Sequence, residues 1–274
     1  MSRSKTALVT GATDGIGRQT ALELATNHGF SVLVHGRTAQ KATEVASAIA
    51  GATPVWGDFA SLAEVRSLAE QVIAVAPALE VLVNNAGVFM KERVLTGDGF
   101  ETTFQVNHLA PLLLTHGLMP ALRAADAARV VNVSSMTHQR GRVDLKDLNF
   151  ERRFDGHSAY SSSKLMNVLF THELARRVSK SHITTSALHP GVISTKLLRQ
   201  GWGSSGATLW AGARTSVYCA TAPALERVSG KYYSDAKETP CAAHANDPKL
   251  EKALYLESCR LVAIAALEGQ RPVD

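Results

Sequence analysis

The chain has 274 residues, of which 45% are hydrophobic and 19% are charged, and its formal net charge is +5. A chain of this length can bury a substantial core and fits a single α/β domain. Its basic residues form no long run, so we expect no nucleic-acid partner. No apolar stretch reaches the ~18 residues that a membrane-spanning helix needs, so we also expect no transmembrane anchor.

The cysteines and the N-terminus indicate a compartment. Cys219, Cys241 and Cys259 are far apart and odd in number, and the sequence contains no CxxC or HExxH motif. This pattern predicts neither a disulfide framework nor a metal site. Met1 to Lys5 lead directly into the first predicted strand, which leaves no room for a signal peptide. We therefore expect a cytoplasmic protein.

A glycine-rich turn, TGATDGIG, follows the first predicted strand at 7–9, and a helical pattern follows the turn. This order is typical of a site that binds the pyrophosphate of a dinucleotide at the helix N-terminus. Gly11 allows a sharp turn, Gly15 lets the backbone approach the pyrophosphate, and Gly17 lets the helix pack on the strand. Taken alone, the motif is equally compatible with an ordinary tight turn.

The second and third predicted strands, 31–35 and 53–56, are each followed by a glycine and a charged residue. Arg37 lies twenty residues beyond the last glycine of the turn, where an NAD-binding fold places an acidic group. A guanidinium there suits a 2′-phosphate, which predicts NADP, whereas a solvated loop arginine is the alternative. Asp58 is placed to accept a hydrogen bond from an adenine amino group, to cap the helix predicted at 61–76, or both.

Further strands are predicted at 81–83, 129–134 and 183–188, with a short one near 231–233. Strands that alternate with helices predict an α/β fold, a doubly wound parallel sheet of about seven strands with helices on both faces. We expect a single domain over 1–274. The segments after three strands contain small and polar residues, and they are Asn84–Gly87, Ser134–Ser135 and His189–Gly191. They fall at the edge where such sheets bind ligands.

Helices are predicted over about 39–50, 99–122, 207–220 and 248–266. Asn107 lies inside the second of these. Asparagine is unfavourable in the middle of a helix, so it either faces solvent or has a specific task.

Another helical pattern, from Ala159 to Ala175, carries Tyr160 and Lys164 on one face because they are four residues apart. The ammonium favours the phenolate and is expected to lower the pKa of Tyr160 below its free value of about 10. Such a phenol can exchange a proton with an alcohol or carbonyl oxygen. The pair alone is common by chance, so the rest of the chain decides its meaning.

Two segments have unusual composition. Residues 136–158 show little periodicity and much charge, which predicts an excursion beside the site. Residues 192–210 combine several glycines with Trp202 and Trp210. A flexible backbone with apolar anchors is typical of a closing substrate lid, whereas a plain surface loop is the alternative.

The motifs TGATDGIG, NNAG, VVNVSS, YSSSK and HPG, in this order, resemble the short-chain dehydrogenase/reductase family over nearly the whole chain. The stretches SAYSSSKLMNVLFTHELARRV, ALHPGVISTKLLR and SGKYYSDAKETP are similar to its retinol dehydrogenase-like and WW-domain-oxidoreductase-like members. The resemblance implies a small-molecule alcohol or carbonyl substrate of lipophilic character. Family members often form dimers or tetramers, so a homo-oligomer is a further expectation.

The resemblance also implies roles for individual residues. Tyr160 is the expected general acid/base, and Lys164 is expected to lower its pKa and bind the nicotinamide ribose. Ser135 is expected to hold the substrate oxygen, with Ser134 as its competitor, and Asn107 to support a water next to Lys164. The implied cofactor contacts are Gly11, Thr13, Asp14, Gly15, Ile16, Gly17, Arg37, Thr38, Asp58, Phe59, Asn85, Ala86, Gly87, Tyr160, Lys164, Pro190, Gly191, Val192 and Thr195.

We therefore predict an NADP(H)-dependent oxidoreductase that interconverts an alcohol and a carbonyl, with NADP preferred to NAD. One alternative is a non-catalytic NADP-binding sensor or scaffold, against which the intact Asn107, Ser135, Tyr160 and Lys164 argue. The other is a sugar-nucleotide epimerase or dehydratase with the same Tyr/Lys pair. The GxxxGxG spacing and the short C-terminal region argue against that activity.

Overall fold

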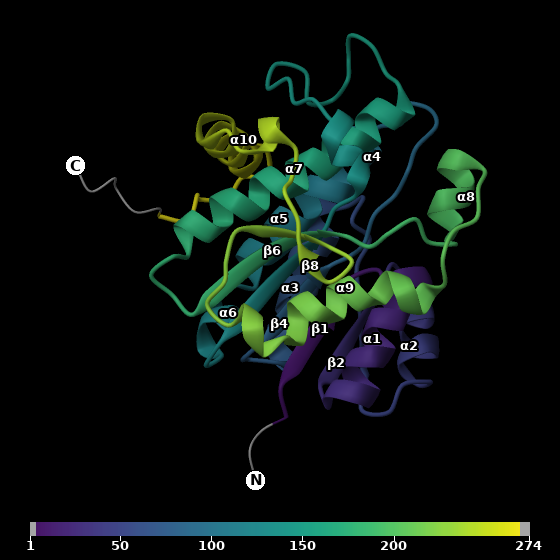
Figure 1. The fold of residues 1–274 in the computed structure, drawn as a ribbon, viewed down its shortest axis with the longest axis vertical. Coiled ribbons are helices and arrows are strands. Elements are labelled where there is room, and N and C mark those ends of the chain that lie inside the picture. Colours follow the sequence, from purple (N-terminus) through teal and green to yellow (C-terminus); the bar gives the residue numbers. More distant parts are fainter. Residues whose placement is uncertain (1–3, 269–274) are drawn as a thin grey trace.

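The computed structural model describes residues 4–268, which form one eight-stranded sheet with helices on both faces (Figure 1). The strand order is β3-β2-β1-β4-β5-β6-β7-β8. The first seven strands in this order pair in parallel, and β8 pairs antiparallel with β7. The strands are β1 (Thr6–Val9), β2 (Ser31–Gly36), β3 (Thr53–Trp56), β4 (Val81–Asn84), β5 (Ala128–Val133), β6 (Ile183–His189), β7 (Lys231–Ser234) and β8 (Lys237–Glu238).

The expected doubly wound sheet is confirmed, with one strand more than the seven or so predicted. The additional strand, β8, is joined to β7 by a tight turn. Asp235 and Ala236 in this turn have φ values of 54° and 55°. Two successive left-handed residues match the twist of a two-residue hairpin. Asp-Ala is not the Asn-Gly or Asp-Gly pair that normally indicates such a turn, which is why the sequence did not reveal it.

The helices follow the predicted alternation. They are α1 (Gly15–His28), α2 (Ala39–Ala46), α3 (Leu62–Val75), α4 (Thr102–Phe104), α5 (Ala110–Gly117), α6 (Met119–Ala124), α7 (Gly156–Arg177), α8 (Lys196–Trp202), α9 (Leu209–Thr221) and α10 (Pro248–Leu261). The shorter turns are η1 (Gln105–Leu109), η2 (Met136–Arg140), η3 (Pro223–Leu225) and η4 (Ala243–Ala245).

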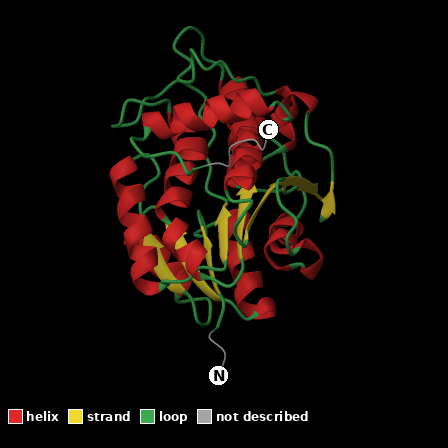
Figure 2. Ribbon diagram, turned by 90° about the vertical axis from the view of Figure 1, so that its left-hand side faces the viewer, coloured by secondary structure: helices red, strands yellow, loops and turns green. Residues whose placement is uncertain are grey.

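Different helices cover the two faces of the sheet. Helices α1, α2 and α9 pack on one face, and α3, α5, α7 and α10 pack on the other. Figure 2 shows helices on both sides of the strands. Successive residues of a strand point to opposite faces, so Leu8 enters one core while Ala7 and Val9 enter the other. Both cores are buried, which explains why the strands appear in the sequence as continuous apolar runs.

The long helix expected over 99–122 is broken into shorter pieces. Helix α4 is followed by the π-helical turn η1, then by α5 and α6. Pro120 lies in the first turn of α6, where its missing N–H removes a helical hydrogen bond. Asn107 lies in the π-turn and is fully buried, so it does not face solvent. Such turns inside helices frequently occur at functional sites.

Two other helices are shorter than predicted. Helix α2 ends at Ala46 instead of about residue 50. Helix α10 ends at Leu261 instead of about residue 266. Ala263 adopts a φ of 52°, and the Ile264 amide donates to the Cys259 carbonyl at 3.0 Å, which closes the end of α10. No helix within residues 4–268 has both the length and the apolar character to cross a membrane.

A buried ionic network joins α7 to α10, which lies beside it (Figure 1). Glu251 of α10 is paired with His172 at 3.0 Å and with Arg176. Burial alone would lower the pKa of His172, but hydrogen bonds and charge from Cys241 and Glu251 together raise it to about 9. His172 is therefore a cation at neutral pH.

The His172–Glu251 pair predicts a pH-dependent contribution to stability. The pKa of His172 is raised above its unfolded value of 6.5, so its contribution is complete below pH 6.5 and is lost as the pH rises through about 9. Unfolding of the wild type and of His172→Gln should be followed in urea at several pH values. The stability gap between the two should shrink from pH 6.5 upward. A gap that stays constant would show that packing, not charge, is what His172 contributes.

Candidate active site

The glycine-rich loop between β1 and α1 is held tightly against β4. Gly11 has a φ of 63°, and a Cβ there would lie 2.9 Å from the Ala86 Cα. A Cβ on Gly17 would lie 2.3 Å from the Gly11 carbonyl oxygen. The Asn85 side chain donates to the carbonyl of Thr10 at 2.8 Å. Only glycine fits at these two positions, so the sequence interpretation of Gly11 and Gly17 agrees with the geometry.

His35 at the end of β2 connects the glycine loop to β3. Its Nδ1 accepts the Gly11 amide at 3.1 Å, and its Nε2 donates to the Gly57 carbonyl at 2.9 Å. Burial lowers the pKa of His35 to about 4, so the ring is neutral at physiological pH. No motif in the sequence marks this residue. A histidine in an apolar strand is the only signal.

The first turn of α1 is prepared to bind an anion. Asp14 is the N-cap and accepts the Gly15 amide at 2.8 Å. The amides of Ile16 and Gly17 have no acceptor among residues 4–268. Free amides at the N-terminus of a long helix attract phosphate groups. The loop therefore fits the pyrophosphate of a dinucleotide, with Gly15 at a φ of 57° leaving its surface clear of a side chain.

The ends of β2 and β3 lie beside this loop. A Cβ on Gly36 would lie 2.6 Å from the Thr13 methyl group, so Gly36 contacts the glycine loop. Arg37 is the next residue in the chain. Arg37 is exposed and makes no hydrogen bond or ion pair with other described residues. Thr38 caps α2 by accepting the Lys41 amide.

Asp58 does not cap α3, contrary to one of the two roles considered for it. Ser61 is the cap, and Asp58 accepts the Ala60 amide at 2.9 Å. Phe59 is buried and stacks on His35 with ring centres 4.8 Å apart. Its side chain therefore belongs to the core, and only its backbone can take part in a cofactor contact.

The four expected catalytic residues lie together at the same edge of the sheet. Lys164 is buried, and its Nζ donates to the Val133 carbonyl at 3.0 Å. The same Nζ lies 5.5 Å from the centre of the Tyr160 ring. Asn107 bonds to both backbone groups of Val88 and donates to the Ser163 hydroxyl at 3.0 Å. Its side chain thus ties the segment after β4 to α7.

Burial, rather than the neighbouring ammonium, dominates the acid–base properties of the pair. Burial raises the pKa of Tyr160 above its ordinary value of 10, although a hydrogen bond with Ser135 acts in the opposite direction. Burial lowers the pKa of Lys164 to about 8. The expectation that Lys164 brings the Tyr160 pKa below 10 is therefore wrong, because the loss of solvation is the larger effect.

The two candidate serines have different partners. The Ser134 hydroxyl is buried and donates to the Lys164 carbonyl at 2.7 Å. The Ser135 hydroxyl hydrogen-bonds with Tyr160, so Ser135 is the one that faces the phenol. His138, which was not expected here, fixes the Ser135 backbone. Its Nδ1 donates to the Ser135 carbonyl at 2.7 Å, and its Nε2 accepts the Ala242 amide at 3.0 Å.

The segment after β6 covers the site. Gly191 has a φ of 97°, and Thr195 caps α8. The Thr195 methyl group would lie 3.6 Å from a Cβ on Gly15, so this segment reaches the glycine loop. Lys196 pairs with Asp14 at 2.7 Å, a contact that the sequence did not predict. Pro190 and Val192 flank Gly191, and Val192 is 49% exposed.

Trp202 at the end of α8 packs directly on the expected acid/base. Its ring centre lies 5.4 Å from that of Tyr160, 5.4 Å from Phe89 and 5.2 Å from His157. Trp210, the other tryptophan of the segment, is 58% exposed and outside this cluster. Phe89 and His157 carry no sequence signal that would have placed them here.

Comparisons with known proteins agree with this arrangement. Residues 5–202 match the family model described as short chain dehydrogenase. Retinol dehydrogenase 12 of Homo sapiens is 40% identical over 277 residues, covering 95% of this chain and 87% of the relative. Retinol dehydrogenase 13 of Homo sapiens is 40% identical over 284 residues, covering 96% and 86%.

Solved structures show the same fold. The crystal structure of an uncharacterized protein from Mycobacterium Paratuberculosis aligns with a TM-score of 0.79 and 33% identity, covering 95% of this chain and 94% of that chain. A 3-ketoacyl-(acyl-carrier-protein) reductase from Brucella melitensis, complexed with NADH, aligns with a TM-score of 0.68 at 22% identity, covering 84% and 96%.

The chain belongs to the short chain dehydrogenase family, and within it to the retinol dehydrogenase-like subgroup. It is an oxidoreductase of the class that acts on CH–OH groups, and this family uses nicotinamide cofactors. The family, the Rossmann fold and the enzyme class predicted from the motifs are confirmed.

Proposed function

We propose that the protein is an NADP(H)-dependent oxidoreductase that interconverts an alcohol and a carbonyl on a small lipophilic substrate. The observation that carries the proposal is the gathering of Tyr160, Lys164, Ser135 and Asn107 beside the free amides of α1. The relatives named retinol dehydrogenases support a lipophilic alcohol as substrate class. The free cysteines, of which Cys219 and Cys259 are buried, fit a reducing compartment, and we place the protein in the cytoplasm.

The residues of the chain divide the chemistry between them. In the reducing direction the Tyr160 hydroxyl donates its proton to the carbonyl oxygen, and the Ser135 hydroxyl holds the same oxygen. The Lys164 ammonium, 5.5 Å from the ring, stabilises the phenolate that is left. Asn107 fixes α7 against β4 so that these groups stay aligned. Bound nicotinamide supplies the hydride to the substrate carbon, or accepts it in the oxidising direction.

The proposal gives residues 192–210 the role of a substrate lid on a single catalytic domain. Trp202 covers Tyr160, so a substrate reaches the phenol only when α8 moves away. The Lys196–Asp14 pair and the Ser194–Gly206 hydrogen bonds hold the segment in place. The pair is largely exposed, and exposed pairs contribute little, so the packing of Trp202 on Tyr160, Phe89 and His157 is the main contact that opening must break.

Tyr160→Phe should remove most turnover and keep the fold and cofactor binding. The ring preserves the packing, whereas the lost hydroxyl is the proton donor, so the rate should fall at least ~10²–10⁴-fold. Tyr218→Phe is the matched control because Tyr218 lies on α9 and packs on Tyr233, away from the site. Activity is measured from nicotinamide absorbance with a panel of lipophilic alcohols and aldehydes. Cofactor binding by the wild type without turnover of any substrate would favour a sensor.

Arg37→Asp should weaken or reverse a preference for NADP. A guanidinium–phosphate contact contributes ~1.5–3 kcal/mol, which corresponds to roughly ten- to a hundred-fold in binding. Arg37→Lys should keep much of the preference because it keeps the charge. The measurement is the dissociation constant of each oxidised cofactor at fixed ionic strength. Equal or tighter binding of NAD by the wild type would show that Arg37 is only a surface residue.

Lid movement should change the fluorescence of Trp202. The indole now packs against Tyr160, Phe89 and His157, so substrate binding to the cofactor complex should shift or quench its emission. Trp202→Phe should abolish the signal, whereas Trp56→Phe should retain it because Trp56 lies on β3. A signal that survives Trp202→Phe would contradict this role for α8.

A further inference from the structure

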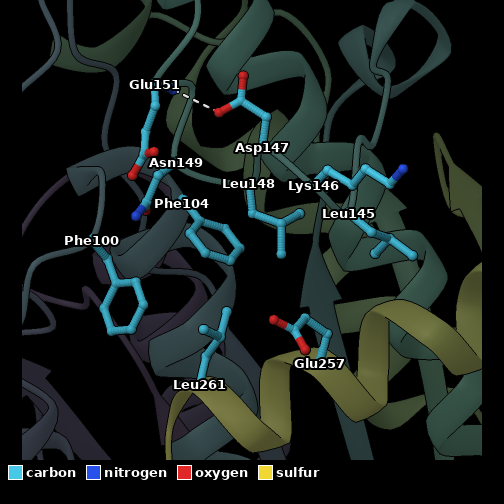
Figure 3. A pocket seen from close by; sticks show the side chains of 10 residues that line it. All are labelled: Phe100, Phe104, Leu145, Lys146, Asp147, Leu148, Asn149, Glu151, Glu257 and Leu261. Atoms are coloured by element: carbon cyan, nitrogen blue, oxygen red, sulfur yellow. Dashed lines mark hydrogen bonds between the residues drawn. The ribbon is translucent and has the colours of Figure 1, made fainter.

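Two cavities lie on different sides of the segment 134–155, which connects β5 to α7. One is a cavity of about 150 Å³ that faces α10, and Figure 3 shows its lining. The other, of about 250 Å³, faces α7. Asp147 and Leu148 line both, so this stretch of the connection forms a wall between them.

The two cavities differ in the charged residues that line them. The cavity beside α10 is lined by carboxylates of Asp147, Glu151 and Glu257, by one lysine, and by no arginine. Figure 3 shows these groups around the apolar side chains of that cavity. The cavity beside α7, which we call the arginine pocket, is lined by Arg140, Arg142, Arg152 and Arg153.

The acidic residues of the arginine pocket are already engaged. Asp144 pairs with Arg152 at 3.2 Å and accepts the Lys146 amide at 2.9 Å. Asp147 accepts the backbone amides of Glu151 and Arg152 at 2.7 and 3.4 Å. These carboxylates therefore hold the connection in shape and neutralise one of the four guanidinium groups.

The other guanidinium groups keep free donors. Arg140 and Arg153 make no hydrogen bond or ion pair with other described residues. Arg153 lies near Asp155, but that carboxylate caps α7 by accepting the Ser158 amide at 2.8 Å. The Arg142 guanidinium donates one bond, to the carbonyl of Gly141 at 2.8 Å, and the Arg142 amide donates to the Ser162 hydroxyl at 3.2 Å. Guanidinium groups with free donors are suited to bind carboxylate or phosphate, often through two bonds at once.

Three apolar side chains, those of Leu148, Phe150 and Met166, line the pocket beside its charged groups and its two serines. Leu148 and Met166 are 7% and 2% exposed, and Phe150 completes this part of the lining. Phe150 has a φ of 51°, a left-handed conformation that is uncommon for an aromatic residue. A turn bond from its amide to the Asp147 carbonyl maintains it. Backbone strain of this kind occurs preferentially at ligand sites.

The arginine pocket is separate from the active site. Ser158, Ser162 and Met166 line it at intervals of four residues, so they share one face of α7. Tyr160 lies two residues from both serines and thus on roughly the opposite face. A ligand in the pocket would contact the catalytic helix from behind without meeting the substrate or the cofactor.

We propose that the arginine pocket binds a small amphipathic anion, a carboxylate or phosphate joined to a short apolar group. The anion would contact Arg140, Arg142 and Arg153, and the apolar group would lie against Phe150 and Met166. Neither the reaction nor the cofactor requires this site, so the proposal stands independently of the proposed function.

The test is calorimetric titration of the full chain with hexyl phosphate at constant ionic strength. The wild type should bind hexyl phosphate more tightly than inorganic phosphate, because only the former fills the apolar part. Arg140→Gln/Arg153→Gln should weaken hexyl phosphate binding at least about ten-fold. The double variant should keep its turnover and its unfolding temperature, since both side chains are exposed and have no partner within residues 4–268.

Two controls make the test specific. Arg123→Gln/Lys180→Gln removes two other exposed cations and should leave binding unchanged. Arg37→Gln, which alters the proposed cofactor phosphate site, should also leave it unchanged. The proposal is overturned if hexyl phosphate fails to bind at millimolar concentration, or binds no better than inorganic phosphate. It is also overturned if only anionic phosphatidylcholine–phosphatidic acid vesicles bind, since that would indicate a surface effect and not a pocket.

Discussion

The active site depends on how α7 attaches to the end of β5. Lys164 Nζ and Asn167 Nδ2 both donate to the carbonyl of Val133, and the Ser134 hydroxyl donates back to the Lys164 carbonyl. A buried ammonium is costly unless it is hydrogen-bonded, so the Val133 carbonyl holds Lys164 at this strand end. The position of Lys164 in turn fixes Tyr160, one helical turn earlier, against Ser135. The catalytic geometry is therefore a consequence of satisfying one buried cation.

The attachment extends through the sheet as a series of buried amide contacts. Asn84 at the end of β4 donates to Asn132 on β5, which donates to Thr171 on α7. These buried bonds keep β4, β5 and α7 in register, although the Asn84 Oδ1 atom has no hydrogen-bond partner among the described residues. Asn107 adds a parallel connection from β4 to α7. Both connections end on the helix that carries Tyr160.

Local patterns allowed the sequence to predict the strands, the glycine loop and the catalytic helix. Gly11 and Gly17 were interpretable because their roles depend on backbone space within one βα unit. His35 and His138 were not, because their partners, such as Gly57 and Ala242, are distant in sequence. The prediction that the Tyr160 pKa lies below 10 was wrong because that pKa also depends on distant parts of the chain. Spacing revealed the nearby ammonium, but only the folded structure reveals how completely the phenol is buried.

Burial of Tyr160 and Lys164 links the proposed lid to the proposed proton transfer. The same loss of solvent raises the Tyr160 pKa and lowers that of Lys164, so both shifts have the same cause. Trp202 contributes to it, since its ring packs on Tyr160. Water that enters when α8 moves away would bring both pKa values back toward those of free side chains. Closure does the reverse, because the loss of solvent around the phenol outweighs the attraction of the nearby ammonium. In the proposed function, the position of α8 therefore controls both the access of substrate to Tyr160 and the pKa values of Tyr160 and Lys164.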